Sequence, residues 1–256
     1  MQGVIIMSVT IKSEREIELM REAGKILAAV HEELREFIQP GITTLDIDKK
    51  TRELIKGYGC IASFLNYNGY PASVCVSVNE QVVHGIPSKG RILNNGDIVS
   101  LDAGVIYKGY HSDAARTWAV GEITEDAKEL IRVTQQSFFE GIKYAKTGNH
   151  LNDISSAIQN YVESFGFSVV RDLVGHGIGT KLHEDPQIPN FAQKRRGIRL
   201  EPGMTFAIEP MVNAGRPEVY WESDDWTVVT EDRSLSAHYE NTILITEGEP
   251  EIFSLK

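Results

Sequence analysis

Apolar residues recur every three or four positions in four stretches of the chain, which is the period of amphipathic helices. In the first stretch, Ser13 and Glu16 have the spacing of a capping box, and Pro40 and Gly41 end the apolar stripe that follows. The same pattern predicts further helices at residues 44–56, 124–146 and 151–164. Glycines at or shortly after the ends of these stretches support each boundary.

Between the helical stretches lie runs with the alternating or continuous apolar character of strands. "ASVCVSV" at residues 72–78 is one such run, and "GDIVSLDAGVIYKGYHSDAARTWAVG" at residues 96–121 is another. The second run contains Lys108 and Gly109 near its middle, where a tight turn would fold it into a hairpin. Later runs, "GMTFAIE" and "SAHYENTILIT", are also typical of strands.

The order of helix, helix and strands occurs twice. Shifting the chain by 107 positions places Gly41 on Gly148 and Gly59 on Gly166, and it also aligns identical residues in the pairs Asp46 and Asp153, and Ile47 and Ile154. These identities fall where helices start or stop, which favours a duplicated unit. We therefore predict an α+β fold in one catalytic domain, residues 13–256, after a short segment 1–12. Its two pseudo-symmetric halves would span about 13–121 and 122–252, with a shared site near the axis between them.

Two carboxylates interrupt the predicted hairpin. Asp102 and Asp113 lie on its two strands, where an unpaired charge should not be buried. They are directly opposite if the turn is centred between residues 107 and 108, and diagonal neighbours if it is centred between 108 and 109. Either register leaves both side chains on one face, where like charges repel unless a cation or a shared proton lies between them.

The second half has the same anomaly. Glu209 ends one apolar strand before Pro210, and Glu240 interrupts another. Each carboxylate alone is compatible with an ordinary strand-end or edge charge. Two from each half are explained together by one shared cation-binding face, and two divalent ions would match four carboxylates in charge.

Two histidines lie seven positions apart in "LVGHGIGTKLHEDP", residues 173–186. The glycines around His176 argue against a helix, and in an extended segment the odd spacing predicts that His176 and His183 point to opposite sides. His176, whose backbone can approach other groups closely, is the better candidate for a ligand. One imidazole among carboxylates suits Mn, Fe, Co or Zn in their divalent state.

The composition limits the partners and the compartment. A net charge of −10 disfavours binding to DNA, and the one short basic cluster is explained either as a solvated loop or as a transient contact with the ribosome; it comprises Lys194, Arg195, Arg196 and Arg199. Two cysteines cannot build a disulfide framework, and no stretch has the length of a membrane span. The opening "MQGVIIM" lacks the features of a signal peptide, and either Met1 or Met7 could be the start. We therefore expect a cytoplasmic protein without membrane partners.

Several motifs together resemble those of type I methionine aminopeptidases, over about residues 13–252. They are "HGIP" at 84–87, "DIVSLDAGV", "HSDAARTW", "GHGIGTKLHEDP", "EPGMTFAIEP" and "HYENTILIT". The short span between His183 and Glu209 leaves no room for the helical insertion of type II enzymes. The resemblance implies the pita-bread fold and a hydrolase with two metal ions. Such an enzyme removes the initiator methionine from nascent proteins and peptides and prefers a small second residue.

The resemblance also implies a role for individual residues. The implied metal ligands are Asp102, Asp113, His176, Glu209 and Glu240, with Asp113 and Glu240 bridging the two ions. Hydroxide held between the metals would attack the scissile carbonyl, with Glu209 transferring protons and His84 and His183 contacting the substrate without binding metal. The implied methionine pocket comprises Tyr67, Tyr70, Cys75, Leu182 and Trp226. This chain has Leu182 where relatives often have Phe, and Asn68 where they have His.

Two other functions share the expected fold. A proline-specific aminopeptidase or dipeptidase typically carries a large N-terminal domain, whereas only about a dozen residues precede the first predicted helix here. A non-enzymatic binding protein of the same fold would be expected to have lost metal ligands, and all five are present. An active site built within one chain gives no reason to require a dimer, so we expect a monomer.

Overall fold

The computed structural model describes residues 9–256, so the start of the chain and the interpretation of "MQGVIIM" lie outside the described residues. The helices in this part of the chain are α1 (Glu14–Phe37), α2 (Thr44–Gly57), α3 (Glu125–Ile142) and α4 (Leu151–Ser164), with a 3₁₀ turn at Tyr67–Gly69. The capping box is present at α1, where the backbone N–H of Ser13 donates to the Glu16 carboxylate (2.8 Å). No helix of residues 9–256 combines the length and the apolarity needed to cross a membrane.

The strands of residues 9–256 form four sheets. In the first, β4 (Ile98–Tyr107) pairs with β5 (Tyr110–Ala119) along one edge and with β1 and β2 along the other. The second has the order β15-β14-β9-β7-β8, and the others are β13-β10-β6 and β11-β12-β3. The bounds of the remaining strands are β1 (Ile61–Ala62), β2 (Cys75–Val78), β3 (Gln81–Val83), β6 (Ser168–Val169), β7 (Gly175–Gly177), β8 (Glu184–Ile188), β9 (Thr205–Ile208), β10 (Met211–Asn213), β11 (Val219–Trp221), β12 (Val228–Thr230), β13 (Ser236–His238), β14 (Asn241–Leu244) and β15 (Glu251–Ile252).

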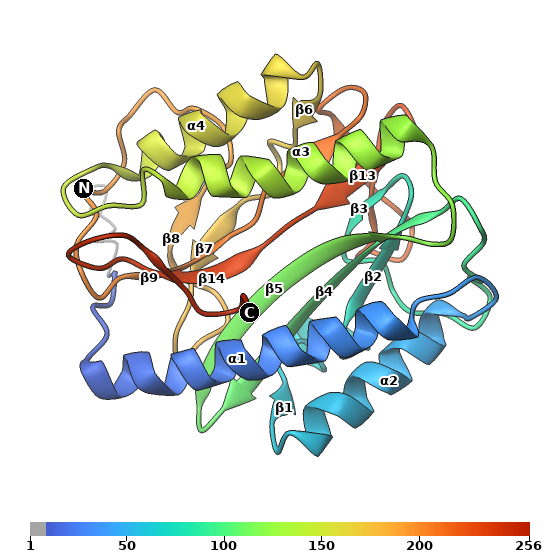
Figure 1. The fold of residues 1–256 in the computed structure, drawn as a ribbon, viewed down its shortest axis with the longest axis horizontal. Helices are drawn as coiled ribbons and strands as arrows, with labels where there is room; N and C mark the ends of the chain where they lie inside the picture. The colour runs from blue at the N-terminus through green and yellow to red at the C-terminus, as the bar shows by residue number, and fades with distance from the viewer. Residues whose placement is uncertain (1–8) are drawn as a thin grey trace, which may run out of the picture.

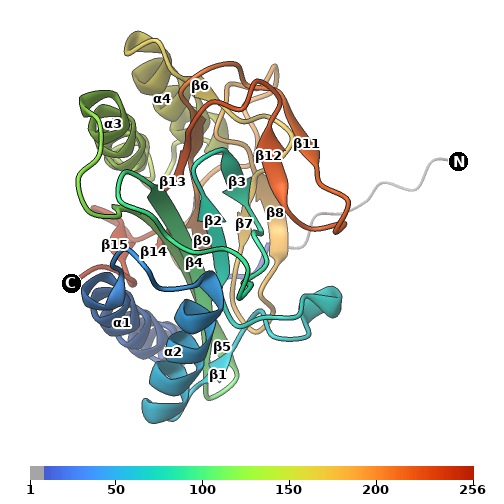
Figure 2. The same cartoon turned by 90° about the vertical axis from the view of Figure 1, so that its right-hand side faces the viewer.

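The four helices lie together on one side of the strands (Figures 1 and 2). Helices α1 and α2 cover the first sheet, and their apolar faces form one core with β2, β4 and β5. Helices α3 and α4 form another core, mainly with strands of the second half. The opposite side of the strands, which carries β8, β11 and β12, is left free of α-helices in the described residues, and only the 3₁₀ turn at Tyr67–Gly69 lies there (Figure 2). This arrangement leaves that side of the strands available for a site.

The shift of 107 positions also relates local structures in the two halves. Helices α2 and α4 begin and end 107 residues apart. The backbone N–H of Gly41 donates to Leu93 (2.8 Å), and that of Gly148 donates to Leu200 (3.0 Å), again 107 residues further on. Both glycines have positive φ, 96° and 92°, a region that favours glycine. The boundaries of the halves themselves stay a prediction.

Two predicted elements are longer than the elements in the structure. Helix α3 ends at Ile142 and not at residue 146, because the last amides tighten into i→i−3 bonds: Ala145 donates to Ile142 (3.0 Å). The run at residues 236–246 is not one strand, since β13 ends at His238 and β14 begins at Asn241. The break falls at Glu240, whose amide crosses to the other half of the molecule and donates to Ala115 (3.0 Å).

Candidate active site

One cavity of about 130 Å³ gathers every site residue that the sequence predicted. Its lining comes from both halves of the molecule and consists of Phe64, Tyr67, Asn68, Tyr70, Cys75, His84, Asp102, Asp113, His176, Leu182, His183, Glu209, Trp226 and Glu240. Of these, Phe64 was not predicted, because an aromatic residue in "SFLNYNGY" carries no signal that separates pocket from core.

The hairpin register decides between the two alternatives for the first carboxylate pair. Tyr107 pairs with Tyr110, so the turn is centred between Lys108 and Gly109. Asp102 therefore lies opposite Ala115 and diagonal to Asp113, with both carboxylates on one face of the hairpin. The register that would place them directly opposite each other is wrong.

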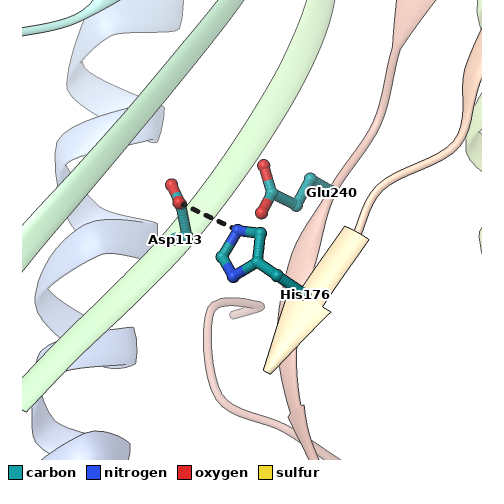
Figure 3. A group of neighbouring side chains, drawn as sticks. All are labelled: Asp113, His176 and Glu240. Carbon is teal, nitrogen blue, oxygen red and sulfur yellow. Dashed lines mark ion pairs between the residues drawn. The ribbon is translucent and has the colours of Figure 1, made fainter. Parts of the chain in front are cut away.

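Asp113, His176 and Glu240 form the tightest part of the cluster (Figure 3). One candidate ligand atom from each lies within 4.8 Å of the others. The Nε2 atom of His176 is 3.9 Å from Asp113 Oδ2 and 3.6 Å from Glu209 Oε1. Its Nδ1 donates to the Gly177 carbonyl (2.8 Å), so in the neutral ring Nε2 presents its lone pair to the carboxylates. Burial, followed by the nearby His183, lowers the pKa of His176 to about 3 and keeps the ring neutral.

The crowded carboxylates are electrostatically unfavourable by themselves. Burial raises the pKa of Asp102 to about 7. Burial, and then the neighbouring carboxylates, raises the pKa of Asp113 and of Glu240 well above the ordinary range, and the pKa of Glu209 is raised in the same way. Asp102 Oδ1 and Glu240 Oε1 are buried without a hydrogen-bond partner. An oxygen-rich donor set with one imidazole and two unsatisfied oxygens fits divalent cations.

The two histidines of the glycine-rich segment do not point to opposite sides, so that prediction was wrong. Their rings are in edge-to-face contact with centroids 4.3 Å apart. The segment is not extended throughout: Gly177 pairs with Glu184, so the chain reverses between β7 and β8 and returns His183 to the same cavity. His183 Nδ1 is hydrogen-bonded to the hydroxyl of Tyr67 (2.9 Å).

An apolar end of the cavity adjoins the charged cluster. Phe64, Tyr70, Cys75 and Leu182 are buried in one hydrophobic group, and Trp226 packs against it. The rings of Tyr70 and Trp226 meet edge to face with centroids 5.1 Å apart. The Tyr70 hydroxyl donates to the Gly85 carbonyl (2.9 Å), which fixes this wall. The cavity thus offers an apolar slot beside the carboxylates.

His238 also belongs to this region and was missed. Its Nε2 is 3.9 Å from Glu209 Oε2 and 4.0 Å from Glu240 Oε2. The signal was present in "HYE", because residues two apart in an extended segment share a face.

Comparisons with known proteins agree with this geometry. The model of metallopeptidase family M24 matches residues 18–247. A methionine aminopeptidase of Clostridium acetobutylicum is 55% identical over 96% of this chain and 99% of its own length. The chain belongs to the methionine aminopeptidases of metallopeptidase family M24. The methionine aminopeptidase of Escherichia coli K12 is 43% identical over 98% of this chain and 95% of its own length.

Structural comparison separates the methionine aminopeptidases from proline-specific enzymes. The crystal structure of the methionine aminopeptidase from Thermotoga maritima superimposes with a TM-score of 0.95 at 48% identity, covering 97% of this chain and all of that one. This match confirms the predicted pita-bread fold. A Xaa-Pro dipeptidase from Bacillus anthracis gives a TM-score of 0.77 at 26% identity, and the match spans 96% of this chain but only 62% of that one.

Proposed function

We propose that this chain is an enzyme that removes the N-terminal methionine from peptides and nascent proteins, with a preference for a small second residue. The observation that supports it most is the single cavity in which five candidate ligands adjoin an apolar slot. Tyr70, Cys75 and Leu182 give this slot polarizable and aliphatic walls, which suit a flexible thioether side chain. The proline-specific alternative and the non-enzymatic binding protein become outcomes of the test below.

Asp102, Asp113, His176, Glu209 and Glu240 would hold two divalent ions. Asp113, His176 and Glu240 are central to this set because their candidate ligand atoms lie within 4.8 Å of one another. Divalent ions in such a site act as Lewis acids, polarising a carbonyl and making water more acidic. Co, Mn, Fe and Zn all remain compatible with this donor set.

The protein's own groups would move the proton and hold the substrate. Glu209, whose pKa burial raises, is suited to take a proton from water and to pass it to the leaving amine. With the Tyr67 hydroxyl donating to Nδ1 of His183, Nε2 carries the ring proton and can donate to the scissile carbonyl oxygen. Burial lowers the pKa of His84 to about 4, so its neutral ring can hydrogen-bond near the scissile nitrogen.

Release of free amino acids from a peptide panel tests the activity. Metal-stripped protein would be supplied in turn with Mn, Fe, Co or Zn and given Met-Ala-Ser, Met-Leu-Ser, Ala-Pro-Ser or N-acetyl-Met-Ala-Ser. We expect metal-dependent release of methionine from Met-Ala-Ser, less from Met-Leu-Ser and none from the acetylated peptide. Cleavage of Ala-Pro-Ser instead would indicate the proline-specific branch, and no release with any ion would favour a binding protein.

The role of His183 has its own test. We expect His183→Ala to lower kcat by roughly 10²–10³-fold, because a donor to the developing oxyanion is lost. Binding of Mn, measured by calorimetry, should not change, since His183 is not among the proposed ligands. An equal loss of metal binding in His183→Ala would contradict the assignment.

The predicted basic cluster at 194–199 is exposed at Lys194, Arg195, Arg196 and Arg199, as a contact with ribosomal RNA requires. We propose this transient ribosome contact, a monomeric state and a cytoplasmic location as parts of the same function.

A further inference from the structure

His238 lies behind the two glutamates of the candidate metal centre. The side chain is 1% exposed and does not line the cavity that would hold the substrate. Its chain neighbours Ala237 and Tyr239 both pack in the core that contains α3 and α4. Because successive side chains of a strand point to opposite faces, the His238 ring projects to the face of Glu240, where it is buried beside the two glutamates.

Hydrogen bonds of its backbone fix the position of His238 on β13. The amide of His238 donates to Thr117 Oγ1 (2.8 Å), and the Thr117 hydroxyl donates to the His238 carbonyl (2.9 Å). On β13, His238 is also paired with Met211. The ring is thus attached at the point where β13 meets β5, two residues before Glu240.

The polar groups around His238 favour a role for its ring as a hydrogen-bond donor. Both ring nitrogens are buried without a hydrogen-bond partner, which is unfavourable unless a partner is close. Nε2 faces Glu209 Oε2 at 3.9 Å and Glu240 Oε2 at 4.0 Å, and in the ionised form that binds metal these carboxylates can only accept. The neighbouring cation, Arg116, is committed elsewhere: it donates to the carbonyls of Ala115, Glu240 and Ser254 and to the Asn241 side chain.

His176 and His238 divide the oxygens of Glu209 between them. The Nε2 atom of His176 faces Oε1 at 3.6 Å, and that of His238 faces Oε2 at 3.9 Å. The two rings differ in their protons: His176 donates from Nδ1 to its own backbone, whereas no carbonyl accepts from Nδ1 of His238. His238 is therefore free to carry its proton on Nε2, on the side of the carboxylates.

We propose that His238 is a positioning residue for the metal centre: its Nε2–H faces Glu209 Oε2 at 3.9 Å and Glu240 Oε2 at 4.0 Å and would form a hydrogen bond to them when the two carboxylates hold metal. This bond would fix which oxygen of each glutamate is turned toward the metal ions. The inference rests on the proposed function, because it takes Glu209 and Glu240 as ligands. Partners of this kind orient metal ligands, and their loss typically lowers metal affinity by roughly 10–100-fold.

Substitutions at position 238 separate the hydrogen bond from packing. His238→Gln can place an amide N–H where Nε2 lies, whereas His238→Asn reaches only the position of Nδ1, and His238→Leu has no donor. The dissociation constant for Mn would be measured by calorimetry on chelator-stripped protein, with folding checked by circular dichroism. The visible absorption spectrum of added Co would report the ligand geometry.

We expect His238→Leu and His238→Asn to raise the dissociation constant by roughly 10–100-fold and to alter the Co spectrum. His238→Gln should stay close to the original protein in both measurements. Equal affinity in all variants, or an equal loss in the Gln, Asn and Leu variants, would overturn the proposal. If the Leu variant does not fold, the comparison of Gln with Asn decides.

Glu240→Gln distinguishes failure of this inference from failure of the proposed function. Retention of full Mn affinity in Glu240→Gln would show that the proposed ligands are wrong. Loss of affinity in Glu240→Gln, together with unchanged affinity in His238→Leu and His238→Asn, would reject only the role of His238.

Discussion

The imidazole of His31 lies on α1, only 2% exposed, with its ring centroid 5.7 Å from that of Trp118. Its Nε2 is hydrogen-bonded to the carbonyl of Ala114 (2.9 Å), so this nitrogen is the donor. Burial, and then the positive charge of Arg116, lowers the pKa of His31 to about 3. The ring therefore stays neutral in the folded protein at pH values where an exposed histidine is charged.

This burial predicts a pH-dependent loss of stability. The unfolded chain binds a proton at His31 below about pH 6.5, whereas the folded protein does not until about pH 3. The free energy of unfolding should therefore fall as the pH decreases from about 6.5 toward 3, by at most about 1.4 kcal/mol per pH unit from this group. His31→Gln keeps an N–H donor for Ala114 but does not titrate.

Urea unfolding of the original protein and of His31→Gln, both metal-free and between pH 4 and 7, would measure this pH dependence of stability. We expect a shallower pH dependence in His31→Gln than in the original protein. Parallel curves would mean that His31 is not the neutral, buried group described here. Because both proteins carry the same carboxylates, their own pH dependence cancels in the comparison.

At the scale of single residues, the site residues that the sequence alone could predict are those whose type is unusual for their position. A carboxylate inside an apolar strand is anomalous, so Asp102 and Asp113 could be found without any knowledge of relatives. Tyr70 and Trp226 are ordinary residues for a hydrophobic core, and only the resemblance to a family predicted that they line a pocket. The contact between His176 and His183 depends on a chain reversal that hydrophobic periodicity does not encode.

Among the elements, β7 is packed closely against the strands on both of its sides. It runs between β8 and β9 with His176 at its centre and a glycine on each side. A Cβ atom added to Gly175 would lie 2.4 Å from the carbonyl oxygen of Ala207, and one added to Gly177 would lie 2.1 Å from that of Asp185. The glycines are therefore required for the close approach of the neighbouring strands, which places His176 among the carboxylates.

Gly175→Ala should accordingly be destabilising. The clash is with backbone, which cannot rotate away, so we expect a loss of about 1–3 kcal/mol in the free energy of unfolding. Displacement of His176 should also weaken Mn binding. Gly57→Ala in the last turn of α2 is the matched control, because its Cβ would meet nothing within 4 Å, and it should be neutral or stabilising by up to about 1 kcal/mol.

Denaturant unfolding and calorimetric titration with Mn on the two variants give both quantities. If Gly175→Ala were as stable and bound Mn as tightly as Gly57→Ala, the close packing of β7 would not be what positions His176.

Element boundaries were predicted well where capping residues mark them and less well elsewhere. Helix α4 begins and ends at the expected residues, and its first turn is fixed by Asp153, which accepts from the His150 amide (2.8 Å). Helix α3 lacks such a signal at its end, and the apolar pattern continues past Ile142 into residues that form a turn. The break before β14 arises from a contact with the other half of the chain, which local sequence cannot show.

Across the whole molecule, the carboxylates connect the two halves. Asp102 and Asp113 come from the first sheet, and Glu209 and Glu240 come from the second half, yet all four line one cavity. In a protein with a net charge of −10, this cluster opposes folding by mutual repulsion unless cations bind it. The metal ions implied by the family would thus join the halves as well as support the reaction.

Metal removal should therefore lower the melting temperature. At a metal concentration about 100 times the dissociation constant, binding stabilises the folded state by about 2.7 kcal/mol. For a chain of this size, that corresponds to a loss of roughly 5–10 °C on chelation. Burial of the carboxyls adds a second expectation: at pH 8, metal-free Glu240→Gln should melt above the metal-free original protein, because a carboxyl whose pKa is raised in the folded state destabilises that state at high pH and Gln does not titrate.

With metal present the order should reverse, since Glu240→Gln has lost a ligand. This inversion separates the cation site from ordinary packing, because a substitution that only disturbed packing would lower the melting temperature in both conditions. Calorimetric scans of the two proteins, with Mn and with chelator, measure all four values. An unchanged melting temperature of the original protein after chelation would show that the four carboxylates do not hold a stabilising cation.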